Sequence, residues 1–466
     1  MSFLFGNSIT IDQPPPTETR PKVDRSNGAR ADVARFYSDL IAQRPALLEE
    51  KLKLHSRIVD EFNLALLEKL SPEELQRQVQ AYIGNYVRVE RISLNHKELD
   101  IFTREVIAEM TGFGPIEPLL KDPTVSDILI NTHNLCFVER FGKLERTDVR
   151  FKDEAHLLRI INKIVSAVGR RVDESSPMVD ARLPDGSRVN VAIRPVSVDG
   201  PMVSIRKFAE RPFNIDRLIE IDTLRPAMAE LLQAAVRGRV SLIISGGTGS
   251  GKTTLLNALS NFIPEEERLI TIEDAAELQL QQLHVGRLET RPANPEGKGE
   301  IRQRELVKNA LRMRPDRIIV GECRGEEAFD MLQAMNTGHE GSMTTIHANS
   351  PRDALKRLEQ MVAMAGMGLP VASIRSHIAS AITLILQLQR LPDGRRRLIS
   401  VEEIRGSEGD VIQMQEIFKF VKEKTDAKGM IIGHFTGTGV RPQFLEELVP
   451  FGIEVPPNIF ELGRRL

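Results

Sequence analysis

The feature that most constrains this chain is the segment from Gly246 to Thr253, whose sequence is Gly-Gly-Thr-Gly-Ser-Gly-Lys-Thr. It fits the pattern G-x4-G-K-[S/T] without a mismatch. An apolar run, Val240 to Ser245, precedes it and a helical pattern, Thr254 to Phe262, follows it. Glycines at these spacings let the backbone fold around an anion, and the helix N-terminus adds partial positive charge. The sequence therefore predicts a phosphate-binding loop between a buried strand and a helix.

Two side chains at the end of this loop carry its chemistry. Lys252 is expected to reach the β- and γ-phosphates of a nucleotide, and the Thr253 hydroxyl to bind Mg²⁺. A glycine-rich turn without a ligand is the alternative, and the lysine, the threonine and both flanking elements argue against it. The residues predicted to bind the nucleotide are Gly246, Gly247, Thr248, Gly249, Ser250, Gly251, Lys252, Thr253 and Thr254.

Acidic residues end two further apolar runs. Arg317 to Val320 is followed by Gly321 and Glu322, at the edge where a parallel sheet gathers its ligands. Glu322 can polarise a water molecule or help to hold the metal. Glu273 closes the run from Leu269 to Ile272 in the same way. We expect paired carboxylates at one phosphate site, although a solvated acid or a helix cap is the common alternative for each.

Histidine and arginine side chains complete the candidate set. His347 ends the run from Met343 to Ile346 and can hydrogen-bond a γ-phosphate, but the residues alone support a satisfied strand-end histidine equally well. Arg182, Arg194 and Arg206 lie at strand edges of an upstream segment. Arginine offers phosphate oxygens two donors at once, although exposed surface charge is the commoner role for any one arginine.

Hydrophobic patterning divides the chain into four segments. Residues 1–30, which contain three consecutive prolines, have little to bury and predict a disordered tail. Apolar residues at three- and four-residue spacing predict a helical domain over 31–110. Short β-type runs with one helix, Glu154 to Val168, predict a middle α+β domain over 111–210.

The last segment, residues 216–466, alternates helices with strands. Several of its strands are apolar without alternation, which is typical of strands buried on both faces, so an α/β domain with a mostly parallel sheet is expected. The candidate strands are Val240 to Ser245, Leu269 to Glu273, Arg317 to Glu322, Met343 to His347, Ala381 to Leu388 and Leu398 to Ile404.

Composition narrows the function classes. The 63 basic and 65 acidic residues give a formal charge of −2, and the chain has no Trp and 3 Tyr, which disfavours a dedicated nucleic-acid binder. Two cysteines, Cys136 and Cys323, cannot form a four-cysteine zinc site. The most apolar stretch, Ile378 to Leu388, is shorter than the roughly 20 residues of a spanning helix. We expect any work at a membrane to be done from the water side.

With these motifs assembled, the chain resembles the secretion-motor ATPases of type II and type IV secretion. Among them it is most similar to the pilus assembly ATPases of the tight-adherence (Tad/Flp) system, the CpaF type. The absence of a four-cysteine zinc insertion favours this branch over type II secretion. The resemblance covers about residues 95–450 and rests on Gly112 to Leu120, Val125 to Ile128, Asp180 to Arg188, Gly246 to Thr253, Ile272 to Asp274, Arg287 to Pro292, Glu296 to Gly299, Leu311 to Glu322 and Thr337 to Asn349.

The resemblance implies a fold, a ring and partners. The fold is an α/β, RecA-like P-loop ATPase domain preceded by an α+β (PAS-like) middle domain and an N-terminal helical bundle. Six copies form a homo-hexamer that uses ATP and Mg²⁺ in the cytoplasm. The ring works at the inner face of the bacterial inner membrane through an integral platform protein that adds or removes pilins. That partner supplies the peripheral membrane contact, and no nucleic acid is expected.

The resemblance also assigns roles to residues. It implies that Glu322 is the main catalytic acid, with a part in metal binding, and that Glu273 helps to align water. His347 becomes a histidine-box residue near the γ-phosphate. Arg194 and Arg206 match middle-domain arginines that reach the phosphates, and Arg182 is a further member of this set.

Two other function classes stay open. A nucleic-acid motor, either a RecA-like helicase or a conjugation-type DNA-transfer ATPase, shares the loop and the acids. The run Arg395-Arg396-Arg397 offers it a local basic patch, although a lone basic run is more often solvated surface. A nucleotide-gated scaffold without turnover would keep the loop but would not need both Glu322 and Glu273.

Overall fold

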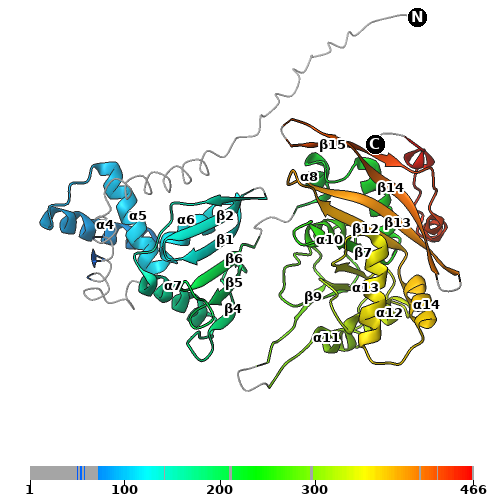
Figure 1. The fold of residues 1–466 in the computed structure, drawn as a ribbon, viewed down its shortest axis with the longest axis horizontal. Coiled ribbons are helices and arrows are strands. Elements are labelled where there is room, and N and C mark those ends of the chain that lie inside the picture. The colour runs from blue at the N-terminus through cyan, green and yellow to red at the C-terminus, as the bar shows by residue number, and fades with distance from the viewer. Residues whose placement is uncertain are drawn as a thin grey trace, which may run out of the picture. The chain divides into compact units, whose positions relative to one another are not determined.

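The computed structural model describes residues 50, 53–54, 57, 72–140, 142–208, 213–293, 298–408, 411–427 and 429–463 (Figure 1). The predicted tail, residues 1–30, and most of the chain before Pro72 lie outside the described residues. The chain divides into two compact units, which are described separately here. The first holds residues up to Val138, Arg146–Leu183 and Val189–Ile205, and the second holds Glu139–Glu145, Pro184–Arg188 and Arg206–Leu466.

The first unit begins with two described helices, α4 (Pro72–Val89) and α5 (His96–Thr111). Pro72 is the first residue of α4, a position where its missing N–H costs nothing. Asn95 caps α5, because its side chain accepts from the Glu98 N–H while the Glu98 carboxylate accepts from the Asn95 N–H. The buried residues of this helical core are Leu54, Val79, Ile83, Tyr86, Phe102 and Val106.

An α+β layer follows in the chain. Its sheet has the order β3-β2-β1-β6-β5-β4, and the side chain of Asp153 caps the N-terminus of α7, whose apolar face is buried. The predicted helix from Glu154 to Val168 is confirmed, and so is the α+β class. The elements are η1 (Gly114–Ile116), α6 (Glu117–Lys121), β1 (Val125–Thr132), β2 (Leu135–Arg140), β3 (Lys143–Arg146), α7 (Glu154–Ala167), β4 (Met178–Arg182), β5 (Arg188–Ala192) and β6 (Met202–Arg206).

The second unit is built on a nine-stranded sheet of order β15-β14-β13-β12-β7-β11-β10-β8-β9. The strands from β12 to β9 in this order are parallel, and β13, β14 and β15 extend the sheet antiparallel. The strands are β7 (Leu242–Gly246), β8 (Leu269–Glu273), β9 (Val285–Glu289), β10 (Arg317–Val320), β11 (Met343–Ile346), β12 (Leu384–Arg390), β13 (Arg396–Glu408), β14 (Val411–Thr425) and β15 (Ile431–Gly437).

Helices cover both faces of this sheet. In β7, Leu242 and Ile244 pack in one core with α9 and α10, while Ile243 packs in a second core with α11 to α14. This alternation explains why the strand is apolar at every position. The helices are α8 (Ile215–Glu220), α9 (Pro226–Arg237), α10 (Lys252–Ser260), α11 (Gln303–Ala310), α12 (Glu327–Met335), α13 (Pro351–Met364), α14 (Val371–Ala381), η2 (Gln443–Phe451) and η3 (Pro457–Phe460).

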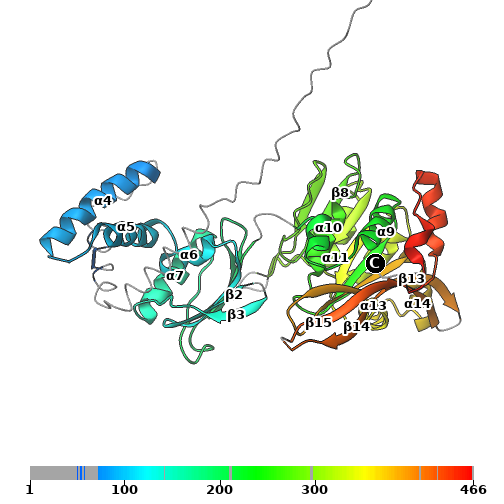
Figure 2. The same cartoon turned by 90° about the horizontal axis from the view of Figure 1, so that it is seen from above.

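The mostly parallel α/β domain is therefore confirmed, and each of the six predicted strands corresponds to an observed one. Three strands of this nine-stranded sheet were not predicted: β9, β14 and β15. The long strands β13 and β14 are drawn in orange in Figures 1 and 2, and β14 is exposed over much of its length. Lysines and glutamates interrupt the apolar residues of β14, so this strand has no continuous apolar run like those that identified the buried strands. No helix within the described ranges is long and apolar enough to cross a membrane.

Candidate functional site

The glycine-rich loop that is predicted to bind phosphate lies between a buried strand and a helix. It leaves β7 at Gly246 and enters α10 at Lys252, and β7 is buried along its whole length. Gly249 and Gly251 have φ of +69° and +98°, a region that glycine enters without strain. A Cβ built at Gly246 would lie 2.5 Å from Ser250 Oγ. The backbone path of the loop thus requires glycine at these three positions.

Lys252 lies folded back over this loop. Its Nζ is 3.1 Å from the Gly247 carbonyl oxygen and 3.2 Å from Nε2 of His347, the residue that follows β11. The side chain is buried, and this burial lowers the pKa of Lys252, partly opposed by the negative charge of Glu322. The Lys252 ammonium is therefore held between the backbone of the glycine-rich loop and the His347 ring, which follows the neighbouring strand.

Glu322 is fixed between two strands. The chain beyond β10 stays tied on both sides, because the Gly321 N–H donates to the Ile272 carbonyl and the Cys323 N–H donates to the Thr345 carbonyl, each at 2.9 Å. The Thr345 hydroxyl also donates to the Gly321 carbonyl at 2.7 Å. These bonds position the backbone on either side of Glu322, so its carboxylate is presented at the carboxyl edge of the sheet.

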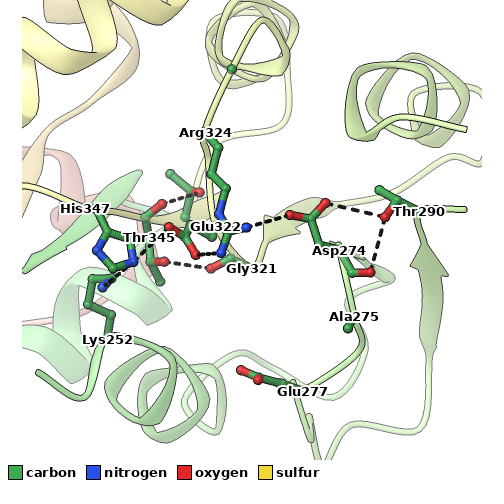
Figure 3. A network of polar contacts seen from close by, with 12 residues as sticks. Lys252, Asp274, Ala275, Glu277, Thr290, Gly321, Glu322, Arg324, Thr345 and His347 are labelled. Atoms are coloured by element: carbon green, nitrogen blue, oxygen red, sulfur yellow. Dashed lines mark hydrogen bonds and ion pairs between the residues drawn. The ribbon is translucent and has the colours of Figure 1, made fainter. Parts of the chain in front are cut away.

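The carboxylate of Glu322 joins Lys252 and His347 in one cluster (Figure 3). Glu322 Oε1 is 3.0 Å from His347 Nε2, and Glu322 Oε2 accepts from Arg324 Nη2 at 2.6 Å. The strands β7, β11 and β10 are neighbours in the sheet, and parallel strands end at the same edge, which brings the three predicted residues together. The other arm of Arg324, Nη1, donates to Asp274 Oδ2 at 3.2 Å.

The three side chains of this cluster differ in their pKa shifts and in their charge at neutral pH. Burial raises the pKa of Glu322, but the hydrogen bond and charge of Arg324, together with the charge of Lys252, outweigh it and hold the pKa below its ordinary value. Burial and the nearby Lys252 charge lower the pKa of His347, so its ring is neutral at pH 7. A neutral Nε2 can donate to Glu322 or accept from Lys252, but it cannot do both. The cluster therefore combines an ionised acid, a cation and a neutral imidazole.

Glu273 is placed beside this cluster rather than in it. Its Oε2 accepts from the backbone N–H groups of Glu277 and Leu278, at 2.7 and 2.9 Å. Its Oε1 is buried and has no hydrogen-bond partner among the described residues, and burial raises the pKa of the carboxyl. A Cβ built at Gly321 would lie 2.9 Å from Glu273 Cγ. Glu273 thus shapes the turn after β8, and its predicted role in aligning water stays a prediction.

Arg396 is a contact of the loop that sequence reasoning missed. It is the first residue of β13, and its Nε donates to the Gly249 carbonyl at 2.8 Å. Because the glycine loop directs its N–H groups toward an anion, a donor on one of its carbonyl oxygens supports the loop from another side. The sequence offered only a weak signal, a position in the middle of a basic run.

The side chains of the basic run Arg395-Arg396-Arg397 do not form a solvent-exposed patch of unpaired charge, because each contacts another part of the protein. Arg395 lies 3.6 Å from Asp393, and Arg397 is 2% exposed and bonded through Nη1 to the side chain and carbonyl of Asp222. With Arg396 on the phosphate loop, each of the three arginines has a different partner within its own unit.

The upstream arginines lie at the ends of strands, as expected. Arg182 ends β4 and Arg206 ends β6. Arg194 follows β5, and its Nε is 3.3 Å from Glu154 Oε1. Contact of Arg182, Arg194 and Arg206 with a nucleotide stays a prediction.

The donor set suits Mg²⁺ bound together with a nucleotide. Thr253 is the second residue of α10, next to Lys252, and Glu322 is ionised. Mg²⁺ prefers hard oxygen ligands and usually takes only one or two from the protein, the others coming from phosphates and water. In the part of the chain that the structure describes, no group of three or more His, Cys, Asp or Glu could hold a metal by itself.

Comparisons with known proteins identify a family and several relatives of this chain. The family described as type II/IV secretion system protein matches residues 109–426. A putative conjugal transfer protein of Mycobacterium tuberculosis is 38% identical over 314 residues, which are 66% of this chain and 89% of that protein. Conjugal transfer protein TrbB of Rhizobium radiobacter is 34% identical over 293 residues, 62% of this chain and 87% of that one.

Among solved structures, the VirB11 ATPase from the Brucella suis type IV secretion system, in complex with sulphate, is 29% identical. The alignment covers 62% of this chain and 94% of that chain, with a TM-score of 0.33.

Proposed function

Because this chain belongs to the type II/IV secretion system protein family, we propose that it is an ATP-hydrolysing motor of a secretion or pilus assembly machine. The observation that carries this proposal is the cluster of Lys252, His347 and Glu322 beside a complete phosphate loop, with contacts of 3.0 to 3.2 Å. A loop that only bound nucleotide would not need an ionised acid at the neighbouring strand end.

The mechanism follows from the positions of these groups. The N–H groups of the loop and the Lys252 ammonium bind the phosphates, and Thr253 and Glu322 are the protein ligands available to Mg²⁺, which supplies charge neutralisation at the phosphates when bound. Glu322 orients the attacking water and can accept its proton. His347 lies between Lys252 and Glu322, where its neutral ring can hydrogen-bond the γ-phosphate. Phosphoryl transfer of this kind depends mainly on positioning and charge stabilisation.

We further propose a homo-hexameric ring that acts at the cytoplasmic face of the inner membrane. Its partner would be an integral platform protein of a tight-adherence pilus, and hydrolysis would drive assembly of pilin subunits, either alone or together with their retraction. Support comes from the motifs Gly112 to Leu120 and Asp180 to Arg188 and from the lack of a four-cysteine zinc site. In this proposal Arg182, Arg194 and Arg206 reach the nucleotide and couple its hydrolysis to motion.

A second candidate is a motor of a conjugation-type transfer system. The names of the relatives from M. tuberculosis and R. radiobacter favour it. A motor that acts on DNA directly is less well supported, because the run Arg395-Arg396-Arg397 is engaged within the protein. A motor that acts on a protein platform fits either system.

The test is the variant Glu322→Gln, which keeps the size of the side chain but removes its charge. We expect turnover of ATP to fall by about a hundredfold or more, since the water loses its acceptor, while binding of a fluorescent ATP analogue persists. Glu220→Gln, in an exposed ion pair with Arg217 on α8, is the matched control and should match the wild type.

Two outcomes would contradict the proposal. Wild-type turnover in Glu322→Gln would remove Glu322 from the chemistry. Strong stimulation of the wild-type ATPase by DNA would favour the nucleic-acid motor instead.

A further inference from the structure

Arg324 lies two residues beyond Glu322, and its guanidinium contacts two carboxylates from different strand ends. Nη2 donates to Glu322 Oε2 at 2.6 Å, and Nη1 donates to Asp274 Oδ2 at 3.2 Å (Figure 3). Glu322 follows β10 and Asp274 follows β8, which is the neighbour of β10 in the sheet. The guanidinium therefore bridges two adjacent strand ends at the edge where the phosphate loop also lies.

The planar guanidinium fixes directions as well as distances. Its donors form a rigid fork, so an arginine held at one nitrogen presents the other at a defined angle. At Glu322 the two oxygens are held separately, Oε2 by Arg324 and Oε1 by contact with His347 at 3.0 Å. The orientation of this carboxylate is thus set by one group from β11 and one from the segment after β10.

The contact with Asp274 restricts the conformation of the Arg324 side chain. The side chain of Arg324 is 57% exposed, and a long exposed side chain without a second contact would exchange among many rotamers. Asp274 is itself held, because Thr290 Oγ1 donates to its carbonyl at 3.2 Å and lies 3.4 Å from Oδ1. Thr290 follows β9, and its N–H donates to the Glu273 carbonyl at 3.0 Å. Asp274 is therefore tied to the edge strand of the sheet.

We propose that Arg324 is a positioning residue for hydrolysis, which aims the Glu322 carboxylate at the water and is itself oriented by Asp274. This inference rests on the proposed ATPase function. Since an exposed ion pair contributes little to stability, removal of Arg324 should misdirect the carboxylate without unfolding the protein. Binding of the nucleotide, which depends on the loop and Lys252, should change little.

The experiment compares kcat and KM for ATP in the wild type, Arg324→Ala, Arg324→Lys, Asp274→Ala and the double variant Arg324→Ala with Asp274→Ala. We expect Arg324→Ala to lower kcat by about tenfold to a hundredfold, because small misplacements of a catalytic group have effects of this size, with KM within about threefold. Arg324→Lys should recover part of kcat, since it keeps the charge but not the fork.

The double variant tests the order of action. If Asp274 works through Arg324, Asp274→Ala lowers kcat by less than Arg324→Ala, and the double variant is no slower than Arg324→Ala alone. Arg217→Ala is the control, because Arg217 is also in an exposed ion pair and is 56% exposed. It should keep the wild-type kcat. Thermal melting and binding of a fluorescent ATP analogue check that each variant folds. If Arg324→Ala does not fold, Asp274→Ala still tests the positioning role through its kcat, because it keeps Arg324 and removes only the carboxylate that orients it.

The outcomes separate the two proposals. Wild-type kcat in Arg324→Ala, or a double variant whose loss is the product of the single losses, overturns the positioning role while the ATPase function stands. A rise in KM with kcat unchanged also overturns it, since Arg324 would then act in binding. A wild-type protein that turns over no ATP overturns the proposed function and this inference together.

Discussion

At the scale of single residues, the chemistry of the site depends on which atoms each side chain meets. Lys252, His347 and Glu322 were predicted from the motif and from strand ends, and they lie in one cluster. Glu273 was predicted by the same argument, yet its Oε2 is occupied by two backbone N–H groups of the following turn. A strand-end acid can therefore support a turn as readily as a reaction, and only its neighbours distinguish the two roles.

Arg396 gives a prediction at this scale. Replacement by alanine removes the donor to the Gly249 carbonyl, so the loop should hold phosphates less firmly. We expect Arg396→Ala to raise KM for ATP by about threefold to tenfold, the range of one ordinary hydrogen bond, with kcat little changed. The measurement is steady-state ATPase kinetics.

The neighbouring Arg395→Ala is the matched control. Arg395 and Arg396 have similar exposure, 38% and 40%, but Arg395 lies near Asp393 rather than at the loop. Equal KM values for the two variants would show that the contact with Gly249 has no part in nucleotide binding.

At the scale of elements, patterns of apolar residues identified the strands buried on both faces and missed those that are partly solvated. β7, β8, β10, β11 and β12 were all recognised because each carries an apolar run. β14 and β15 pair as antiparallel strands at the far side of the sheet, and β9 is its other edge. Edge and half-exposed strands mix charged with apolar residues, so their sequences resemble those of surface loops.

One element depends on a buried ion pair. Arg317 begins β10 and is fully buried. Its Nη2 donates to Glu267 Oε1 at 2.9 Å, and its Nη1 donates to the Val236 carbonyl at the end of α9 at 2.6 Å. Arg317→Ala should lower the free energy of unfolding by about 3 kcal/mol, because it leaves the buried Glu267 with only the half-buried Arg239, 3.3 Å away, as its cation. Chemical denaturation monitored by circular dichroism measures this change.

An exposed ion pair supplies the comparison. Arg302 contacts Glu300 at 2.9 Å with both side chains largely solvated, so Arg302→Ala should leave the free energy of unfolding nearly unchanged. If the two variants were equally stable, the contacts of Arg317 with Glu267 and with the Val236 carbonyl would have no special part in holding β10 in place.

At the scale of the whole molecule, the proposed ring makes a prediction about mass. We expect the full-length protein to form a hexamer that a non-hydrolysable ATP analogue stabilises, because a ligand that binds only the assembled form shifts the equilibrium toward it. Light scattering coupled to size-exclusion chromatography, with and without the analogue, measures this. A persistent monomer with normal ATP turnover would be incompatible with the ring.

The sequence by itself determined the phosphate loop, the α/β class and three members of the candidate site. These follow from local rules: glycine at positive φ, a helix N-terminus after a buried strand, and polar residues where apolar runs end. Tertiary structure decided which of the polar residues meet. The parallel order of β7, β11, β10 and β8 brings Lys252, His347, Glu322 and Arg324 to one edge, and no spacing along the chain encodes that order. The same packing buries Arg397 and places Arg396 on the loop, since each of these contacts joins segments far apart in the sequence. Glu273 differs, because its Oε2 accepts from N–H groups only four and five residues further along the chain.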